Sequence, residues 1–155
     1  MIITFCGHSH FDRQAEYEPI VLALFEKLIG NDPVSFYLGE YGEFDFFAYR
    51  CAKKYKENHP GTSLIFVTPY LTPEYQKNHL VYQKTRFDSI LYPNMETVPL
   101  RFAISHRNRY MVDKADCVIA YVQQSWGGAY QTYQYAKRKG KAIFNLSGND
   151  PILLP

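Results

Sequence analysis

Short apolar runs rich in β-branched and aromatic residues alternate along the chain with longer segments whose apolar residues recur at helical spacing. This alternation constrains the fold more than any other feature, because strands separated by helices favour a mostly parallel sheet covered on both faces. We therefore predict an α/β fold, Rossmann-like and doubly wound, with helices on both faces. The strands are expected at Ile2–Cys6, Val34–Leu38, Ser63–Val67, Ser89–Tyr92, Cys117–Val122 and Ala142–Leu146.

The segments between these runs predict the helices. A chain of 155 residues fits one domain, and without an internal repeat or linker we expect residues 1–155 to form it. Gly30 and Asn31 should end the first helix, and the tail after Gly148 should be a short surface extension. The helical patterns cover Tyr17–Leu28, Phe44–Tyr55, a less clear stretch around Pro73–Lys84, Leu100–Ala115 and Ala129–Lys139.

Composition excludes several classes of protein. The net charge is +2 and no basic run exceeds residues 137–139, which argues against a nucleic-acid partner. No stretch approaches the roughly 20 apolar residues of a membrane span, and the first residues lack an export signal. Cys6, Cys51 and Cys117 show no metal or disulfide spacing, so we expect small buried side chains in a reduced, cytoplasmic protein.

The loops that follow the predicted strands are where a doubly wound sheet binds ligands. Gly127 and Gly128 come directly after a strand and open a helix. Glycine lets backbone amides approach an anion closely, and a helix start favours phosphate or carboxylate. The pair is equally compatible with a turn that merely needs positive φ. Trp126 and Tyr130 flank it and could stack on a base, although packing in the core is the commoner fate.

Arg107 and Asn108 lie in the Leu100–Ala115 segment, and Arg107 falls inside its apolar stripe. An unpaired buried charge is costly, so this guanidinium must find a partner or reach a pocket. Two interpretations stay open. The pair binds a ligand or braces the ligand loops, or Arg107 forms a structural ion pair, with Asp113 or Asp116 as candidates.

Four further polar residues stand in the loops after the first two strands. His8 and His10 could bind metal or shuttle protons, but a third ligand at recognisable spacing is missing, and we predict no metal site. Glu40 and Glu43 are carboxylates in a glycine-bearing loop that could stabilise an oxocarbenium-like centre or hydrogen-bond a ribose. A solvated helix start explains them equally well.

The run Arg107–Asp116, an apolar strand and then Gly127-Gly128 resembles the SLOG superfamily, and is most similar to its YpsA-like branch. Residues 5–8 and the segment Gly39-x-x-Gly42-x-x-Asp45 match that branch in order and spacing. The superfamily includes the DNA-processing protein DprA, Lonely-guy phosphoribohydrolases and sensors of ADP-ribose-related signals. The resemblance implies a nucleotide-ligand pocket lined by Gly7, His8, Gly39, Gly42, Arg107, Asn108, Gly127 and Gly128.

Two positions depart from the relatives. Lonely-guy enzymes share a glutamate in the signature that follows their glycines, whereas the run Trp126–Tyr133 contains none. Many YpsA-like sequences carry arginine where this chain has Ser9. These departures argue against phosphoribohydrolase activity and remove one expected anion contact.

Three functions compete on these grounds. The leading prediction is a sensor or regulatory domain that binds a nucleotide or nucleotide-derived molecule, related to ADP-ribose or NAD, because no general base or nucleophile is evident. No other cofactor is predicted. The first alternative is an N-glycosidic hydrolase or transferase that uses Glu40 or Glu43. The second is a protein-interaction module with a vestigial pocket, in which some of the 14 tyrosines form a homo-oligomer interface.

Overall fold

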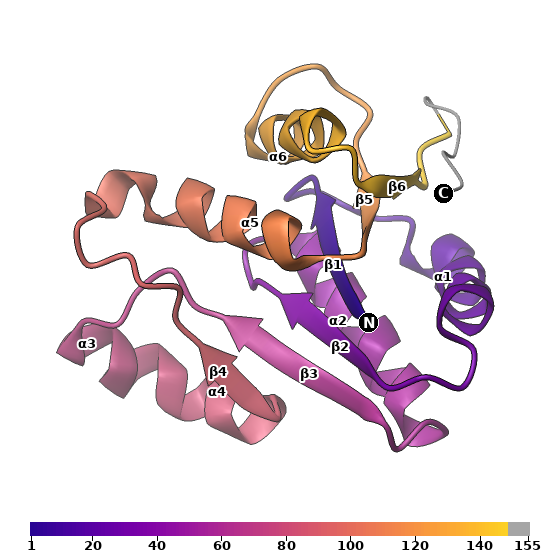
Figure 1. The fold of residues 1–155 in the computed structure, drawn as a ribbon, viewed down its shortest axis with the longest axis horizontal. Helices are drawn as coiled ribbons and strands as arrows, with labels where there is room; N and C mark the ends of the chain where they lie inside the picture. The colour runs from indigo at the N-terminus through magenta and orange to yellow at the C-terminus, as the bar shows by residue number, and fades with distance from the viewer. Residues whose placement is uncertain (149–155) are drawn as a thin grey trace.

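The strands of the computed structural model form one sheet in which every neighbouring pair runs parallel (Figure 1). The structure describes residues 1–148, and the surface extension expected after Gly148 lies outside the described residues. The spatial order is β4-β3-β2-β1-β5-β6, which confirms the predicted α/β, Rossmann-like fold. The strands are β1 (Ile2–Gly7), β2 (Val34–Leu38), β3 (Thr62–Val67), β4 (Ser89–Leu91), β5 (Cys117–Tyr121) and β6 (Ala142–Asn145).

Helices pack on both faces of this sheet. One face is covered by α1 (Gln14–Ile29) and α2 (Glu43–Glu57), and the other by α5 (Ala103–Lys114) and α6 (Gly128–Arg138). Gly30 ends α1 with a φ of 61°, a conformation that glycine adopts without strain. Each helix lies within two or three residues of its prediction, because its apolar stripe matches the helical period.

The least clear part of the sequence is also the least regular part of the chain. Between β3 and β4 it forms α3 (Pro73–Tyr75), a π-helical turn (Gln76–Leu80) and α4 (Val81–Arg86). Thr72 caps α3 by accepting a hydrogen bond from the Tyr75 N–H. A single 3₁₀ turn, Leu100–Phe102, then leads into α5.

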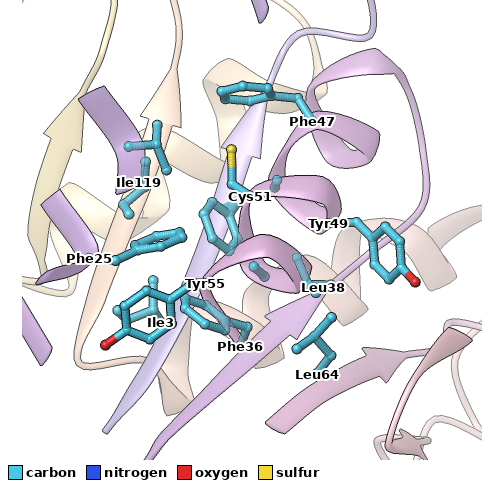
Figure 2. Packing of buried hydrophobic residues seen from close by; sticks show 14 of the residues in the cluster. Ile3, Phe25, Phe36, Leu38, Phe47, Tyr49, Cys51, Tyr55, Leu64 and Ile119 are labelled. Atoms are coloured by element: carbon cyan, nitrogen blue, oxygen red, sulfur yellow. The ribbon is translucent and has the colours of Figure 1, made fainter. Parts of the chain in front are cut away.

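The two faces of the sheet carry different cores. Residues alternate along each strand, so Ile3 and Phe5 face α1 and α2 whereas Cys6 faces α5 and α6. The first core is aromatic. Figure 2 shows Phe25, Phe36 and Tyr55 packed together. The ring centroids of Phe25 and Phe36 are 4.8 Å apart. The second core consists mainly of smaller side chains, such as Val118, Ala120 and Ala136, packed with Tyr133.

The order of the strands determines where a ligand can bind. From β1 the chain runs by way of α1 to β2 on one side, and after β4 it returns by way of α5 to β5 on the other side. Connections therefore leave the carboxyl ends of β1 and β5 on opposite faces of the sheet. A crevice opens at such a switch point, and Gly7 at the end of β1 pairs with Tyr121 at the end of β5.

Candidate functional site

A cavity of about 300 Å³ lies at this switch point. The residues that line it come from segments distant in the sequence, among them Gly7 and His8 at the end of β1, Arg107 and Asn108 on α5, and residues 126–128 before and at the start of α6. The structure thus brings together seven of the predicted site residues. Gly39, Glu40, Gly42 and Glu43 do not line this cavity.

The start of α6 presents backbone amides to the cavity. Gly127 precedes the helix with φ 93° and ψ 174°, and Gly128 is its first residue. The N–H groups in the first turn of a helix have no acceptor within that helix. No side chain in residues 1–148 caps this end of α6. A cavity-facing helix start with free donors attracts anions.

Arg107 also lines the cavity and is only 2% exposed. Its Nη1 donates a hydrogen bond to the Val67 carbonyl at 2.7 Å, and its Nε donates to Asn108 Oδ1 at 3.0 Å. Nη2 donates no hydrogen bond to any residue from 1 to 148. Burial lowers the pKa of this guanidinium.

The expected partners of Arg107 are engaged elsewhere. Asp113 accepts a hydrogen bond from the Tyr135 hydroxyl at 2.7 Å, and Asp116 accepts one from the Ile2 N–H at 2.7 Å. The ion pair considered from the sequence is therefore not formed. Gly39 has a different role beside this arginine: a Cβ there would lie 3.0 Å from the guanidinium carbon, so the glycine makes room for it.

Asp45 also lines the cavity, and the sequence analysis did not select it as a site residue. It lies in the first turn of α2, where one carboxylate oxygen accepts a hydrogen bond from the Tyr41 N–H at 2.9 Å. Burial raises the pKa of Asp45 to about 7, while the positive charge of Arg107 acts in the opposite direction. The spacing Gly39-x-x-Gly42-x-x-Asp45 was the available signal, but spacing alone carries no information about burial.

His8 is held in one tautomer by the loop after β5. Its Nε2 accepts a hydrogen bond from the Gln123 N–H at 2.9 Å, so in the neutral ring the proton sits on Nδ1. Desolvation lowers the pKa of His8, which favours this neutral form. His10, by contrast, is exposed beside Asp12 and Glu43. Residues 1–148 contain no group of three or more His, Cys, Asp or Glu side chains placed to hold a metal ion.

The two glutamates predicted as candidate catalytic groups bind other parts of the protein, Glu40 to α4 and Glu43 to the loop after β1. Glu40 forms an ion pair with Arg86 and accepts a hydrogen bond from Gln83, and it lines a separate cavity of about 730 Å³ between α2 and α4. Glu43 accepts a hydrogen bond from the Phe11 N–H at 2.8 Å. Both carboxylates are bound to protein groups away from the β1–β5 cavity.

Two aromatic side chains stand at the rim of the cavity. Trp126, from the loop before α6, is 69% exposed, and Tyr41, from the loop before α2, is 66% exposed. Large aromatic side chains left this open to solvent beside a cavity provide faces on which a planar ring can stack.

Solved structures share this fold. DNA-processing protein A from Helicobacter pylori, described for its single-stranded DNA binding mode, aligns with a TM-score of 0.63 and 20% identity over 94% of this chain. Its homologue DprA from Streptococcus pneumoniae aligns with a TM-score of 0.65 and 18% identity over 92% of the chain. The structural genomics target TM1055 aligns with a TM-score of 0.56 and 12% identity over 99% of the chain.

These similarities show that the chain shares its fold with DprA, a protein that the sequence resemblance also named, while membership of the SLOG superfamily stays a prediction. The chain covers 64% and 49% of the two DNA-processing proteins. The YpsA-like branch stays a prediction. Comparisons with family profiles and with curated proteins yield no match. None of the helices in residues 1–148 has the length and apolar character needed to cross a bilayer.

Proposed function

We propose that this chain, which shares its fold with DNA-processing protein A, binds a nucleotide or nucleotide-derived small molecule in the cavity between β1 and β5. In this proposal a phosphate of the ligand lies on the first turn of α6. The domain then acts as a sensor or regulatory module, because the cavity combines anion-binding groups with no paired nucleophile and base.

The environment of Gly128 is the observation that carries the proposal. A Cβ at this position would meet no atom within 4 Å, and the residue does not have a positive φ. Neither packing nor backbone conformation therefore requires glycine here. The absence of a side chain does leave the first amides of α6 open to the cavity, as a closely bound phosphate requires.

The remaining walls of the cavity suit the rest of such a ligand. The free Nη2 of Arg107 and the Nδ1–H of His8 add donors for anionic or carbonyl oxygens. The exposed rings of Trp126 and Tyr41 offer stacking faces for a base. A volume of about 300 Å³ is at the small end of ligand pockets, which favours a mononucleotide over a dinucleotide.

A thermal-shift panel of mononucleotides, cyclic nucleotides, nucleosides, ADP-ribose and NAD tests the proposal. A ligand at a hundred times its Kd adds about 2.7 kcal/mol, which should raise the Tm of a domain of this size by roughly 5–10 °C. Gly128→Asp should abolish the shift by repelling phosphate. Gly61→Asp is the matched control, since Gly61 lies before β3 at the opposite end of the sheet. A flat panel would favour the protein-interaction alternative.

Single-stranded DNA binding is a second candidate, favoured by the outer face of α5 and α6. There Arg109, Arg138 and Lys139 surround the ring of Tyr135 at 5.4, 5.8 and 5.5 Å. Clustered cations around an aromatic ring suit a phosphate backbone. Fluorescence anisotropy with a labelled oligonucleotide should then show binding that weakens with salt and in Arg138→Ala/Lys139→Ala. Binding unaffected by this double substitution would exclude the face.

A further inference from the structure

Among residues 1–148, Asp45 is the one carboxylate that lines the β1–β5 cavity, and the proposed phosphate contact does not use it. One of its oxygens accepts the Tyr41 N–H, and residues 1–148 donate no hydrogen bond to the other. The protein does not fully enclose this second oxygen. A molecule in the cavity can therefore reach it.

The charges around Asp45 leave this carboxylate incompletely compensated. Arg107 approaches from α5, but its donated hydrogen bonds go to Val67 and Asn108, and no lysine, arginine or histidine of the described chain forms an ion pair with Asp45. Glu40, two residues after the end of β2, adds negative charge near Asp45. Burial is the main cause that raises the pKa of Asp45 to about 7, and the charge of Glu40 adds to it.

We infer that Asp45 binds the vicinal hydroxyls of a ribose whose phosphate lies on the first turn of α6, so that the site selects ribonucleotides over 2′-deoxyribonucleotides. This inference rests on the proposed function and assigns its sugar subsite. An ionised carboxylate only accepts hydrogen bonds, and a ribose diol supplies two hydroxyl donors at matching spacing. Carboxylates near the end of the second strand recognise ribose in this way in other Rossmann-like folds.

The single tryptophan of the chain makes the test direct. Trp126 stands at the rim of the cavity, so its fluorescence should report on occupancy. Titrations use the common ribonucleoside monophosphates and their 2′-deoxy counterparts at pH 8, where Asp45 is mostly ionised, with calorimetry on the same samples. A hydrogen bond to a charged group corresponds to about ten- to hundredfold in Kd, and we expect this preference for the ribose form.

Asp45→Asn should abolish the preference while preserving the shape of the side chain and an acceptor for the Tyr41 N–H. The affinity for the ribonucleotide should fall further than that for the deoxyribonucleotide, which offers Asp45 only its 3′-hydroxyl, so that the two affinities become equal. Asp12→Asn is the matched control, because Asp12 lies outside the cavity with a side chain 76% exposed. Circular dichroism establishes that both variants are folded.

The outcomes separate the two proposals. If ribose and deoxyribose forms bind the unmodified protein equally, or if Asp45→Asn keeps the preference, the sugar subsite is wrong while the phosphate site on α6 stands. If no nucleotide binds by either method, the proposed function itself is wrong, and the subsite is overturned with it.

Discussion

The five glycines that the sequence predicted at the site fall into two groups that look alike in sequence and differ in their surroundings. At Gly7, Gly39 and Gly42 the protein occupies the space that a side chain would need: the nearest atoms lie 2.3, 3.0 and 2.6 Å from a Cβ. At Gly127 the nearest atom is 3.7 Å away, and at Gly128 no atom lies within 4 Å.

The first group of glycines is required by close packing around the site, whereas the second group leaves space free at the cavity. The first group lets Phe44, Arg107 and the loop at Ser9 pack against the backbone. The second group leaves the start of α6 bare. Substitution should therefore reduce stability in the first group, whereas at Gly128 it should reduce binding without affecting stability.

Gly42→Ala should have the largest effect. Gly42 has φ 116°, and a Cβ would lie 2.6 Å from the backbone Cα of Ser9, which cannot move aside as a side chain end would. Strain and overpacking together should cost about 3–5 kcal/mol. Urea denaturation measures this loss, and a loss below about 1 kcal/mol would contradict the assignment of Gly42 to the packing group.

Gly7→Ala should follow, at about 2–3 kcal/mol, because its Cβ would clash with the Phe44 ring at 2.3 Å. Phe44 is buried against Phe11, so the ring has little room to move. A smaller side chain in Phe44→Leu should partly relieve the clash. The double mutant should be more stable than the sum of the single effects by at least about 0.5 kcal/mol. Strict additivity in the same urea titrations would mean that the ring is not the obstacle.

Asp45→Asn tests the effect of a buried charge in place of a missing side chain. This substitution should raise the free energy of unfolding by about 1–3 kcal/mol at pH 8. The pKa of Asp45 is raised to about 7 by burial, so the stability that its protonated form contributes is fully present below pH 3.8 and is lost as pH rises towards and through 7. The variant should therefore be the more stable protein at pH 8.

The pH dependence distinguishes this cause from a general packing effect. Unfolding titrations of both proteins at pH 5 and pH 8 should show the advantage of Asp45→Asn growing with pH, since asparagine does not ionise. An advantage of equal size at both values would mean that the carboxyl group is not responsible.

Gly128→Ala should have the smallest effect on stability, within about 0.5 kcal/mol, because the added methyl group meets no protein atom. The same substitution should weaken binding of a phosphorylated ligand by at least about tenfold, equivalent to about 1.4 kcal/mol. Gly127→Ala is the comparison, and its φ of 93° should cost about 1–3 kcal/mol. A ligand that binds the two alanine variants and the unmodified protein equally would place the phosphate elsewhere.

The local pattern of the sequence predicted most of the secondary structure. Strands and helices follow from apolar periodicity, and the start of α6 at Gly128 was visible because glycines there interrupt a strand-to-helix pattern. The candidate site was predicted in part. Seven of its residues meet in one cavity, since the loops after parallel strands share one edge of the sheet.

The choice among carboxylates was not predictable in this way. Glu40, Glu43 and Asp45 occupy one short segment, and the sequence analysis favoured the two glutamates as site residues. Whether each side chain meets Arg86, the Phe11 amide or the cavity depends on helix rotation and on loops from elsewhere in the chain. These are contacts between residues far apart in sequence.

The sequence by itself therefore determined the alternation of strands and helices, the glycine-led start of α6 and the need to accommodate a buried arginine, because these depend on neighbouring residues. Only the tertiary structure decided the strand order, the partners of Arg107 and the burial of Asp45. The physical reason is that desolvation and charge compensation arise from every group that packs around a site, and the backbone path that assembles those groups is a property of the whole fold.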